Sequence, residues 1–288
     1  MHRFQTSGPA RLRIEIPKGR IRVQVDEGSE TRVELTAIHG DATALAWIAD
    51  AEVAQSGDDV IVRIRKSGMT LFGVGGAIEA VVHTAAGSAA NLAMGSGRIE
   101  TLGRLGDVSA TSGSGEIRLG ETSGVLARTG SGDIAVASST GSVDAKTGSG
   151  RIVVGKVGLD ARITTGSGHA ELDEAMGDAR LSTGSGNIEI GHAGQNLEAF
   201  AASGNVQIRC ADHGRVRAKT ISGRISVGVA NGVAALLDIS TMSGRVSSEL
   251  EPGAAPTGDE RRVELVISTM SGNVKVARVP SAGFEAGL

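Results

Sequence analysis

Apolar and polar residues alternate with a period of two along most of the chain. Near the N-terminus the apolar positions include Leu12, Ile14, Ile16, Ile21 and Val23, and most residues between them are charged or polar. Strict alternation is typical of a β-strand that buries one face and exposes the other. The pattern therefore predicts a protein built mainly of strands.

A recurring Ser-Gly pair interrupts the alternation. It is followed by one variable residue and then by Ile, Val or Ala, and it begins at ten serines: Ser96, Ser114, Ser131, Ser149, Ser167, Ser185, Ser203, Ser222, Ser243 and Ser271. The first six intervals between these serines are 18, 17, 18, 18, 18 and 18 residues. A fixed short period indicates one repeated unit whose copies stack to bury a shared core.

The repeat predicts an all-β fold, namely a parallel β-solenoid (β-helix or β-roll-like) with about 18 residues per coil. The ten serines mark its structural corners, where neighbouring glycines permit positive φ angles and close stacking. Each repeat is expected to add one coil in chain order. The variable residue after Ser-Gly, such as Arg98, Glu116 or Asn187, is interpreted as part of a solvated column that fixes the register of the coils.

The same patterns divide the chain into four segments. We expect a β-rich N-terminal cap, a glycine-rich linker, the repeat solenoid and a short tail, over residues 1–68, 69–77, 78–279 and 280–288 respectively. Within the cap, Asp41 is placed to begin one short helix over residues 42–49 that presents Leu45, Trp47 and Ile48. The phrase Lys18-Gly19-Arg20-Ile21 is interpreted as a degenerate first copy of the repeat.

Composition narrows the possible partners. With 29 basic and 32 acidic residues, the chain lacks the positive charge expected for a nucleic-acid partner. No apolar segment is long enough to predict membrane insertion. The N-terminus shows no apolar run typical of a secretory signal, so a cytoplasmic location is expected. The 43 glycines and the absence of tyrosine predict a narrow core, because large aromatic side chains fill wide ones.

Candidate catalytic chemistry is absent from the sequence. A Gly-Ser-Gly corner repeated many times does not have the spacing of a nucleophile elbow. The six histidines are scattered, and Cys210 is the only cysteine, so no metal site is predicted. We expect no catalytic residues, no cofactor and no enzymatic activity.

The Gly-Ser-Gly repeats resemble the bacterial putative-adhesin family of β-strand repeats, a domain of unknown function. The resemblance is carried by Gly113-Ser114-Gly115, Gly130-Ser131-Gly132, Gly148-Ser149-Gly150, Gly166-Ser167-Gly168 and Gly184-Ser185-Gly186, and covers about residues 78–279. It implies opposing strands in a solenoid of the pectate-lyase-like β-helix superfamily. It also implies a non-enzymatic scaffold that binds a protein or glycan partner, with extracellular or surface display as the alternative location.

Two other classes of function stay open. A cytoplasmic, self-assembling element resembling the bactofilins would make self-association its main activity. A carbohydrate-active enzyme of pectate-lyase-like shape is disfavoured because the chain lacks clustered acidic and basic residues. Recognition of a partner is expected where the period is broken, at residues 251–259, at residues 66–76 and at the helix carrying Trp47.

Overall fold

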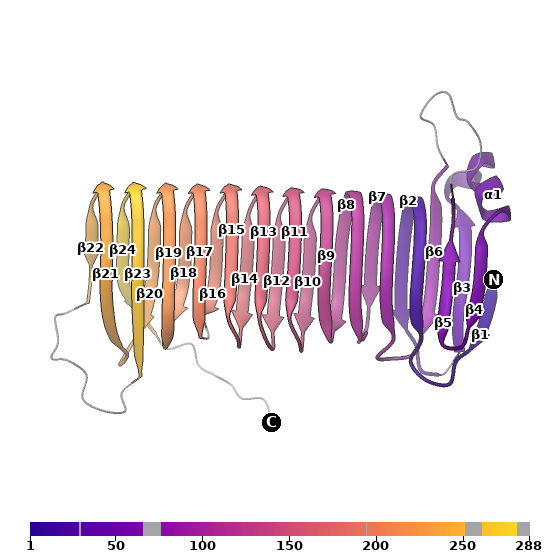
Figure 1. Cartoon of the computed structure of the whole chain (residues 1–288), viewed down its shortest axis with the longest axis horizontal. Helices are drawn as coiled ribbons and strands as arrows, with labels where there is room; N and C mark the ends of the chain where they lie inside the picture. Colours follow the sequence, from indigo (N-terminus) through magenta and orange to yellow (C-terminus); the bar gives the residue numbers. More distant parts are fainter. Residues whose placement is uncertain (29, 66–75, 194, 251–260, 281–288) are drawn as a thin grey trace. The chain divides into compact units, whose positions relative to one another are not determined.

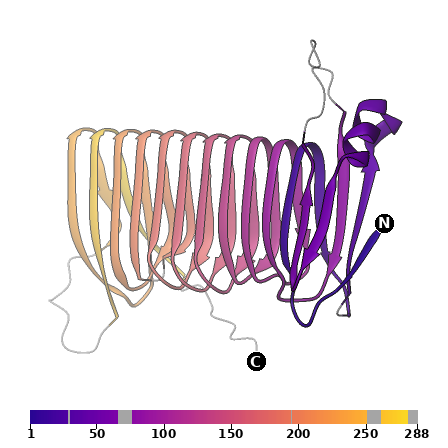
Figure 2. The same cartoon turned by 45° about the vertical axis from the view of Figure 1, so that its right-hand side comes forward.

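The computed structural model describes residues 1–28, 30–65, 76–193, 195–250 and 261–280 (Figure 1). The chain divides into two compact units, Met1–Ser149 and Gly150–Leu288. Both units are built from stacked parallel strands (Figure 2). The predicted all-β parallel solenoid with one short helix is therefore confirmed.

The first unit contains eleven of the strands in the described residues, one 3-10 turn and the α-helix. The elements are β1 (His2–Gln5), β2 (Arg11–Val25), β3 (Glu30–Ala37), η1 (Ile38–Gly40), α1 (Ala42–Ala49), β4 (Glu52–Ser56), β5 (Asp59–Arg63), β6 (Ile78–Thr84), β7 (Ala89–Leu102), β8 (Asp107–Thr122), β9 (Gly124–Ser131), β10 (Ile134–Ser139) and β11 (Val143–Ser149).

The second unit contains only strands in its described part. They are β12 (Ile152–Val157), β13 (Ala161–Ser167), β14 (Ala170–Ala175), β15 (Ala179–Ser185), β16 (Ile188–Ala193), β17 (Asn196–Ser203), β18 (Val206–Ala211), β19 (Gly214–Ser222), β20 (Ile225–Ala230), β21 (Ala234–Ser243), β22 (Val246–Ser248), β23 (Arg262–Ser271) and β24 (Val274–Val279). Among the described residues of the chain, no helix is long and apolar enough to cross a membrane.

Equivalent residues of successive coils stack in register and form the core. In the first unit Ala127 lies beside Ala110 and Ala145, while Ile134 lies beside Ile117 on the other sheet. All five side chains are buried. Small alanines on one sheet face β-branched residues on the other, so the space between the sheets is narrow and needs no large aromatic side chain.

The N-terminal coil is inserted out of chain order. Strand β2 pairs in parallel with β7 in the expected alignment, with Lys18 opposite Ser96 and Gly19 opposite Gly97. This confirms the degenerate first copy of the repeat. On its other side β2 pairs with β5 and β6, so its coil lies between two coils that come later in the chain. Residues 11–25 are thus part of the stack, although they fall in the segment expected to form the cap.

Antiparallel strands and the helix cover the N-terminal end of the first unit. Strand β3 pairs with β6, β1 pairs with β3, and β4 pairs with β5, all antiparallel. Asp41 accepts hydrogen bonds from the backbone N–H groups of Thr43 and Ala44 at 2.7 and 3.1 Å, as an N-cap should. Trp47 is 2% exposed, but Leu45 is 54% exposed. The helix therefore buries Trp47 and leaves Leu45 exposed to solvent.

The last two coils of the second unit exchange places. Strand β23 pairs with β19 on one side and with β21 on the other, and β24 likewise lies between β20 and β22 (Figure 1). The expectation of one coil per repeat in chain order is therefore wrong here. The 28-residue interval between Ser243 and Ser271 supplies enough chain for this return, whereas an 18-residue interval supplies only one coil.

Some sequence expectations lie outside the described residues. They concern most of the linker (residues 69–75), the loop over residues 251–259 and nearly all of the tail (residues 281–288).

Candidate functional site

In each unit, the structure places the marker serines in a column at a corner of the coils. In the first unit Ser96, Ser114, Ser131 and Ser149 are aligned on neighbouring strands. In the second unit the order is Ser167, Ser185, Ser203, Ser222, Ser271 and Ser243, which follows the exchanged coils. The serines therefore occupy equivalent structural positions rather than converging on one catalytic centre.

Most corners combine a glycine after the marker serine with a threonine two residues before it, as the coil of Ser185 illustrates. Gly186 has a φ of +150°, and a Cβ at that residue would come within 1.9 Å of the carbonyl oxygen of Gly168 in the neighbouring coil. Thr183, buried two residues before the serine, donates a hydrogen bond of 3.1 Å to that same oxygen. The corner carbonyl is satisfied by this side chain, as burial requires.

The column directly after Ser-Gly also joins the coils. The side-chain oxygen of Asn187 accepts from the backbone N–H of Asn205, whose own side-chain oxygen accepts from the N–H of Arg224, both at 2.9 Å. In the first unit Arg98 forms an ion pair of 2.9 Å with Glu116. These contacts support the interpretation that the column holds the register of the coils.

A groove of about 540 Å³ lies on the outer face of the first unit. Five strands that are neighbours in the sheet, β5, β2, β7, β8 and β9, contribute its lining. The lining residues are Arg11, Leu12, Arg13, Asp59, Ala89, Ala90, Asn91, Asp107, Val108, Ser109, Gly124, Val125 and Leu126. The sequence alone did not reveal this site, because its residues belong to separate coils and come together only when the strands pair.

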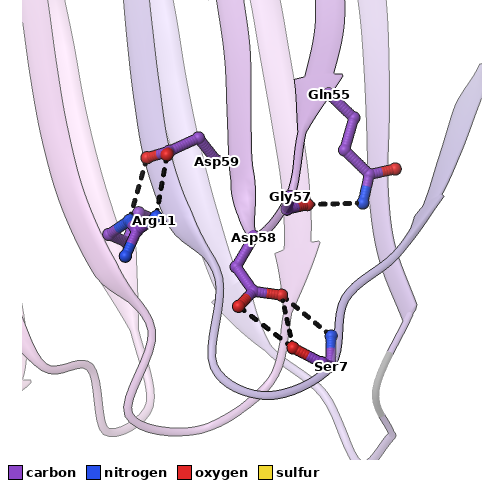
Figure 3. A network of polar contacts seen from close by, with 6 residues as sticks. All are labelled: Ser7, Arg11, Gln55, Gly57, Asp58 and Asp59. Atoms are coloured by element: carbon purple, nitrogen blue, oxygen red, sulfur yellow. Dashed lines mark hydrogen bonds and ion pairs between the residues drawn. The ribbon is translucent and has the colours of Figure 1, made fainter.

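An ion pair forms one side of the groove. Arg11 donates through Nε and Nη2 to the two carboxylate oxygens of Asp59, at 2.9 and 2.8 Å (Figure 3). The hydrogen bond from Arg11 lowers the pKa of Asp59, and the reciprocal bond raises the pKa of Arg11. Asp59 is therefore ionised at neutral pH and holds Arg11 in one orientation.

The turn beside this ion pair is held by a second carboxylate. Asp58 accepts from both the backbone N–H and the hydroxyl of Ser7, at 2.9 Å each (Figure 3). The backbone hydrogen bond from Ser7 is the main reason that the pKa of Asp58 is lowered. Gln55 donates to the carbonyl oxygen of Gly57 at 2.8 Å across the same turn. The side of the groove formed by Arg11 and Asp59 is thus adjacent to a turn that is held by hydrogen bonds.

Small residues leave the space that forms the groove. Ala89 lies next to Arg11 in the sheet. The carboxylate of Asp107 lies close to Gly124, because a Cβ atom added at Gly124 would lie 2.8 Å from Oδ1 of Asp107. Two residues further along the strands, Arg13, Asn91, Ser109 and Leu126 follow one another across the sheet. The groove therefore presents a guanidinium, an amide and a hydroxyl beside one exposed leucine.

A histidine cluster in the second unit is another contact that the sequence did not reveal. His192 Nε2 and His213 Nδ1 lie 3.1 and 2.6 Å from the same oxygen of Asp212. The repeat could have indicated part of this cluster. His192 lies opposite Cys210 on the neighbouring strand, 18 residues later, and Asp212 and His213 follow Cys210 closely in the sequence. Within the described parts of the chain, no group of three or more His, Cys, Asp or Glu residues is arranged to hold a metal ion.

The chain is similar to several solved bacterial structures. A putative adhesin from Bacteroides fragilis is 11% identical with a TM-score of 0.36, covering 96% of this chain and 95% of that chain. A putative adhesin from Parabacteroides distasonis is 9% identical, and a putative lipid binding protein from the same species is 12% identical. Both have a TM-score of 0.31 and the same coverage.

The family of the chain is identified from its sequence. No match was found among curated proteins. The family model described as Toastrack DUF4097 matches residues 12–277, which include most of β2, all of β23 and most of β24. The chain therefore belongs to the Toastrack DUF4097 family.

Proposed function

We propose that this protein is a non-enzymatic, adhesin-like scaffold that binds a polar partner in the groove over β5, β2, β7, β8 and β9. The observation that carries the proposal is the row of Arg13, Asn91 and Ser109 in the groove. Their side chains provide hydrogen-bond donors and acceptors on three adjacent strands of a rigid sheet. Such a row can bind a partner along several points at once.

The contrast with the regular corners supports a binding role for this row. At the corners, polar side chains such as Thr183 and Asn187 are engaged with the neighbouring coil. For Asn91 and Ser109, no side-chain hydrogen bond to another of the described residues is present. Their hydrogen-bonding capacity is therefore available to a ligand.

The chemistry of the groove favours a ligand rich in hydroxyl or amide groups. Donors from Arg13 and Asn91 and acceptors from Asp107 and Ser109 suit groups that both donate and accept. Leu126 adds a small apolar contact. A glycan and an extended polypeptide both have this chemistry, and both belong to the partner classes expected of an adhesin-like scaffold.

The electrostatics of the groove disfavour glycoside hydrolysis. A hydrolase of the usual two-carboxylate type needs one carboxyl group with a raised pKa to protonate the leaving group. In the groove the pKa of Asp59 is instead lowered by its hydrogen bond with Arg11. We therefore propose binding without turnover.

Glycan and peptide arrays test the proposal when wild-type protein is compared with an Arg13→Ala/Asn91→Ala variant. We expect array signals of the wild type that the variant loses. Arg162→Ala, an exposed position on β13, is the matched control and should keep them. Signals that survive in the groove variant would assign binding to another surface.

Adhesion also requires display outside the cell, so we propose a surface location in place of the cytoplasmic one. Protease treatment of intact native cells tests this point. Digestion of the protein on intact cells is expected, with a cytoplasmic marker protein surviving as the control. Protection of both proteins would contradict surface display.

A further inference from the structure

The outermost coil of the second unit leaves core residues uncovered. Leu237, Ile239 and Thr241 of β21 lie opposite Leu265, Ile267 and Thr269 of β23. The three residues of β23 are buried, whereas the three equivalent residues of β21 are only half-buried. On the other sheet, Val246 of β22 is exposed while its neighbour Val274 is buried. The apolar ladders thus end at an open layer.

The backbone at this end is also available for pairing. In the described part of the chain, β21 pairs with β23 alone and β22 pairs with β24 alone. Strand β21 is ten residues long and carries one charge, Asp238, and no proline. Edge strands are normally protected by charges, prolines or short length. By those criteria β21 is an unprotected edge.

The edges of the first unit show the contrast. Strands β1 and β4 have four and five residues and run antiparallel to their neighbours. Each carries an ion pair, Arg3 with Glu30 and Glu52 with Arg63. The chain therefore protects those edges by the usual means, and β21 differs from them in length, charge and apolar content.

Exposed apolar side chains also gather near the open layer. The residue just before the marker serine is glycine in the coils of Ser149, Ser167 and Ser185. In the last three coils of the stack it is Ile221, Met270 and Met242, which are 42%, 50% and 82% exposed. Exposed apolar side chains that adjoin one another mark interaction surfaces.

We propose that the edge formed by β21 and β22 binds the same edge of a second copy of this chain, forming a two-fold symmetric dimer. In a two-fold symmetric contact, if residue i of one copy contacts residue j of the other, residue j of the first copy also contacts residue i of the second. The edge must therefore be complementary to itself. Main-chain hydrogen bonds between the two β21 strands would extend the sheet, as in β-augmentation. The proposal does not depend on the groove in the first unit.

The sequence of β21 is self-complementary when the antiparallel pair is centred on Ile239. Leu236, 69% exposed, then lies opposite Met242 of the second copy, and Leu237 lies opposite Thr241. Asp238 lies opposite Ser240 of the second copy, which separates the two aspartates. In this register inward residues meet inward residues, so the core continues across the contact.

Light scattering after size-exclusion chromatography of the full chain tests the proposal. The wild type should have twice the monomer mass of 29.1 kDa. Leu236→Lys/Met242→Lys should be monomeric, because the register brings the introduced positive charges together. Leu236→Lys/Met242→Glu should remain dimeric, since opposite charges then face each other, and its dimer should weaken at high salt.

A matched control uses two exposed apolar residues elsewhere in the second unit. Leu159→Lys/Met176→Lys removes as many exposed apolar side chains and should leave the dimer intact. Circular dichroism verifies that each variant is folded. A monomeric wild type would overturn the proposal. Equal dimerisation by the two Leu236/Met242 variants would overturn the proposed register and the edge contact together.

Discussion

The hydroxyl group of Thr183 donates a hydrogen bond to the carbonyl oxygen of Gly168 in the neighbouring coil, at 3.1 Å. The same bond recurs from Thr129, Thr147, Thr165 and Thr220 to the equivalent glycine of the adjacent coil. The threonine two residues before the marker serine therefore has a specific role. It satisfies a carbonyl that the tight corner removes from water.

Removing that hydroxyl should destabilise the stack. Thr183→Val keeps the shape of the side chain but leaves the carbonyl oxygen of Gly168 without this donor. We expect a loss of about 1–3 kcal/mol in the free energy of unfolding, measured by urea denaturation. Thr164→Val, at a half-buried outward position on β13 where the hydroxyl has only a longer hydrogen bond of 3.3 Å with Ser182, is the control and should change stability less. Equal losses would show that the hydrogen bond is unimportant.

The corner glycine should tolerate no side chain. Gly186→Ala places a Cβ within 1.9 Å of the carbonyl oxygen of Gly168, at a φ of +150° that L-residues rarely adopt. We expect destabilisation of about 3 kcal/mol or more, or loss of soluble protein. Gly8→Ala meets no atom within 4 Å and should melt like the wild type. A stable Gly186→Ala protein would contradict the geometry of the corner.

A charged side chain at a buried, inward-facing position should destabilise the protein. Ile163 is fully buried and lies opposite Leu181, so Ile163→Asp would bury a carboxylate among apolar neighbours. We expect the thermal midpoint to fall steeply or the protein to be insoluble. Arg162→Ala, on the opposite face of the same strand, should change the midpoint little. Similar losses in the two variants would mean that the faces of β13 are wrongly assigned.

Acid should weaken the polar network beside the groove. The pKa values of Asp58 and Asp59 are lowered in the folded protein by hydrogen bonds from Ser7 and Arg11. A lowered pKa contributes stability above the unfolded value of about 4, and this contribution is lost as the pH falls through the folded pKa. We expect Asp58→Asn/Asp59→Asn to reduce the dependence of the thermal midpoint on pH below about pH 4. An unchanged acid dependence would contradict the assigned hydrogen bonds.

The repeat predicted the fold well because each coil is specified locally. The positions of Thr183, Ser185 and Ile188 relative to Gly186 determine which residues face the core and where the strand turns. A pattern of this kind repeats because every corner meets the same stacking constraint. Trp47 is buried for a different reason, because the end coil of a stack needs residues that cover its core.

The order of the coils could not be read from the repeat. Any coil can stack on any other when their ladders match, as Lys18 beside Ser96 demonstrates. The longer interval before Ser271 permits the chain to return, but it does not say where the last coil inserts. The groove was missed for a related reason. Arg13, Asn91 and Ser109 become neighbours only after strands that are far apart in the chain have paired.

A steric block tests most directly whether the groove binds the partner. Ser109→Trp places a large side chain at an outward, half-buried position within the groove. Ser182→Trp makes the same change at an outward, half-buried position on β15. The measurement is the Kd of each folded variant for the ligand identified on the arrays. We predict that Ser109→Trp raises the Kd by about tenfold or more and that Ser182→Trp leaves it unchanged, whereas equal Kd values for the two variants would contradict binding in the groove.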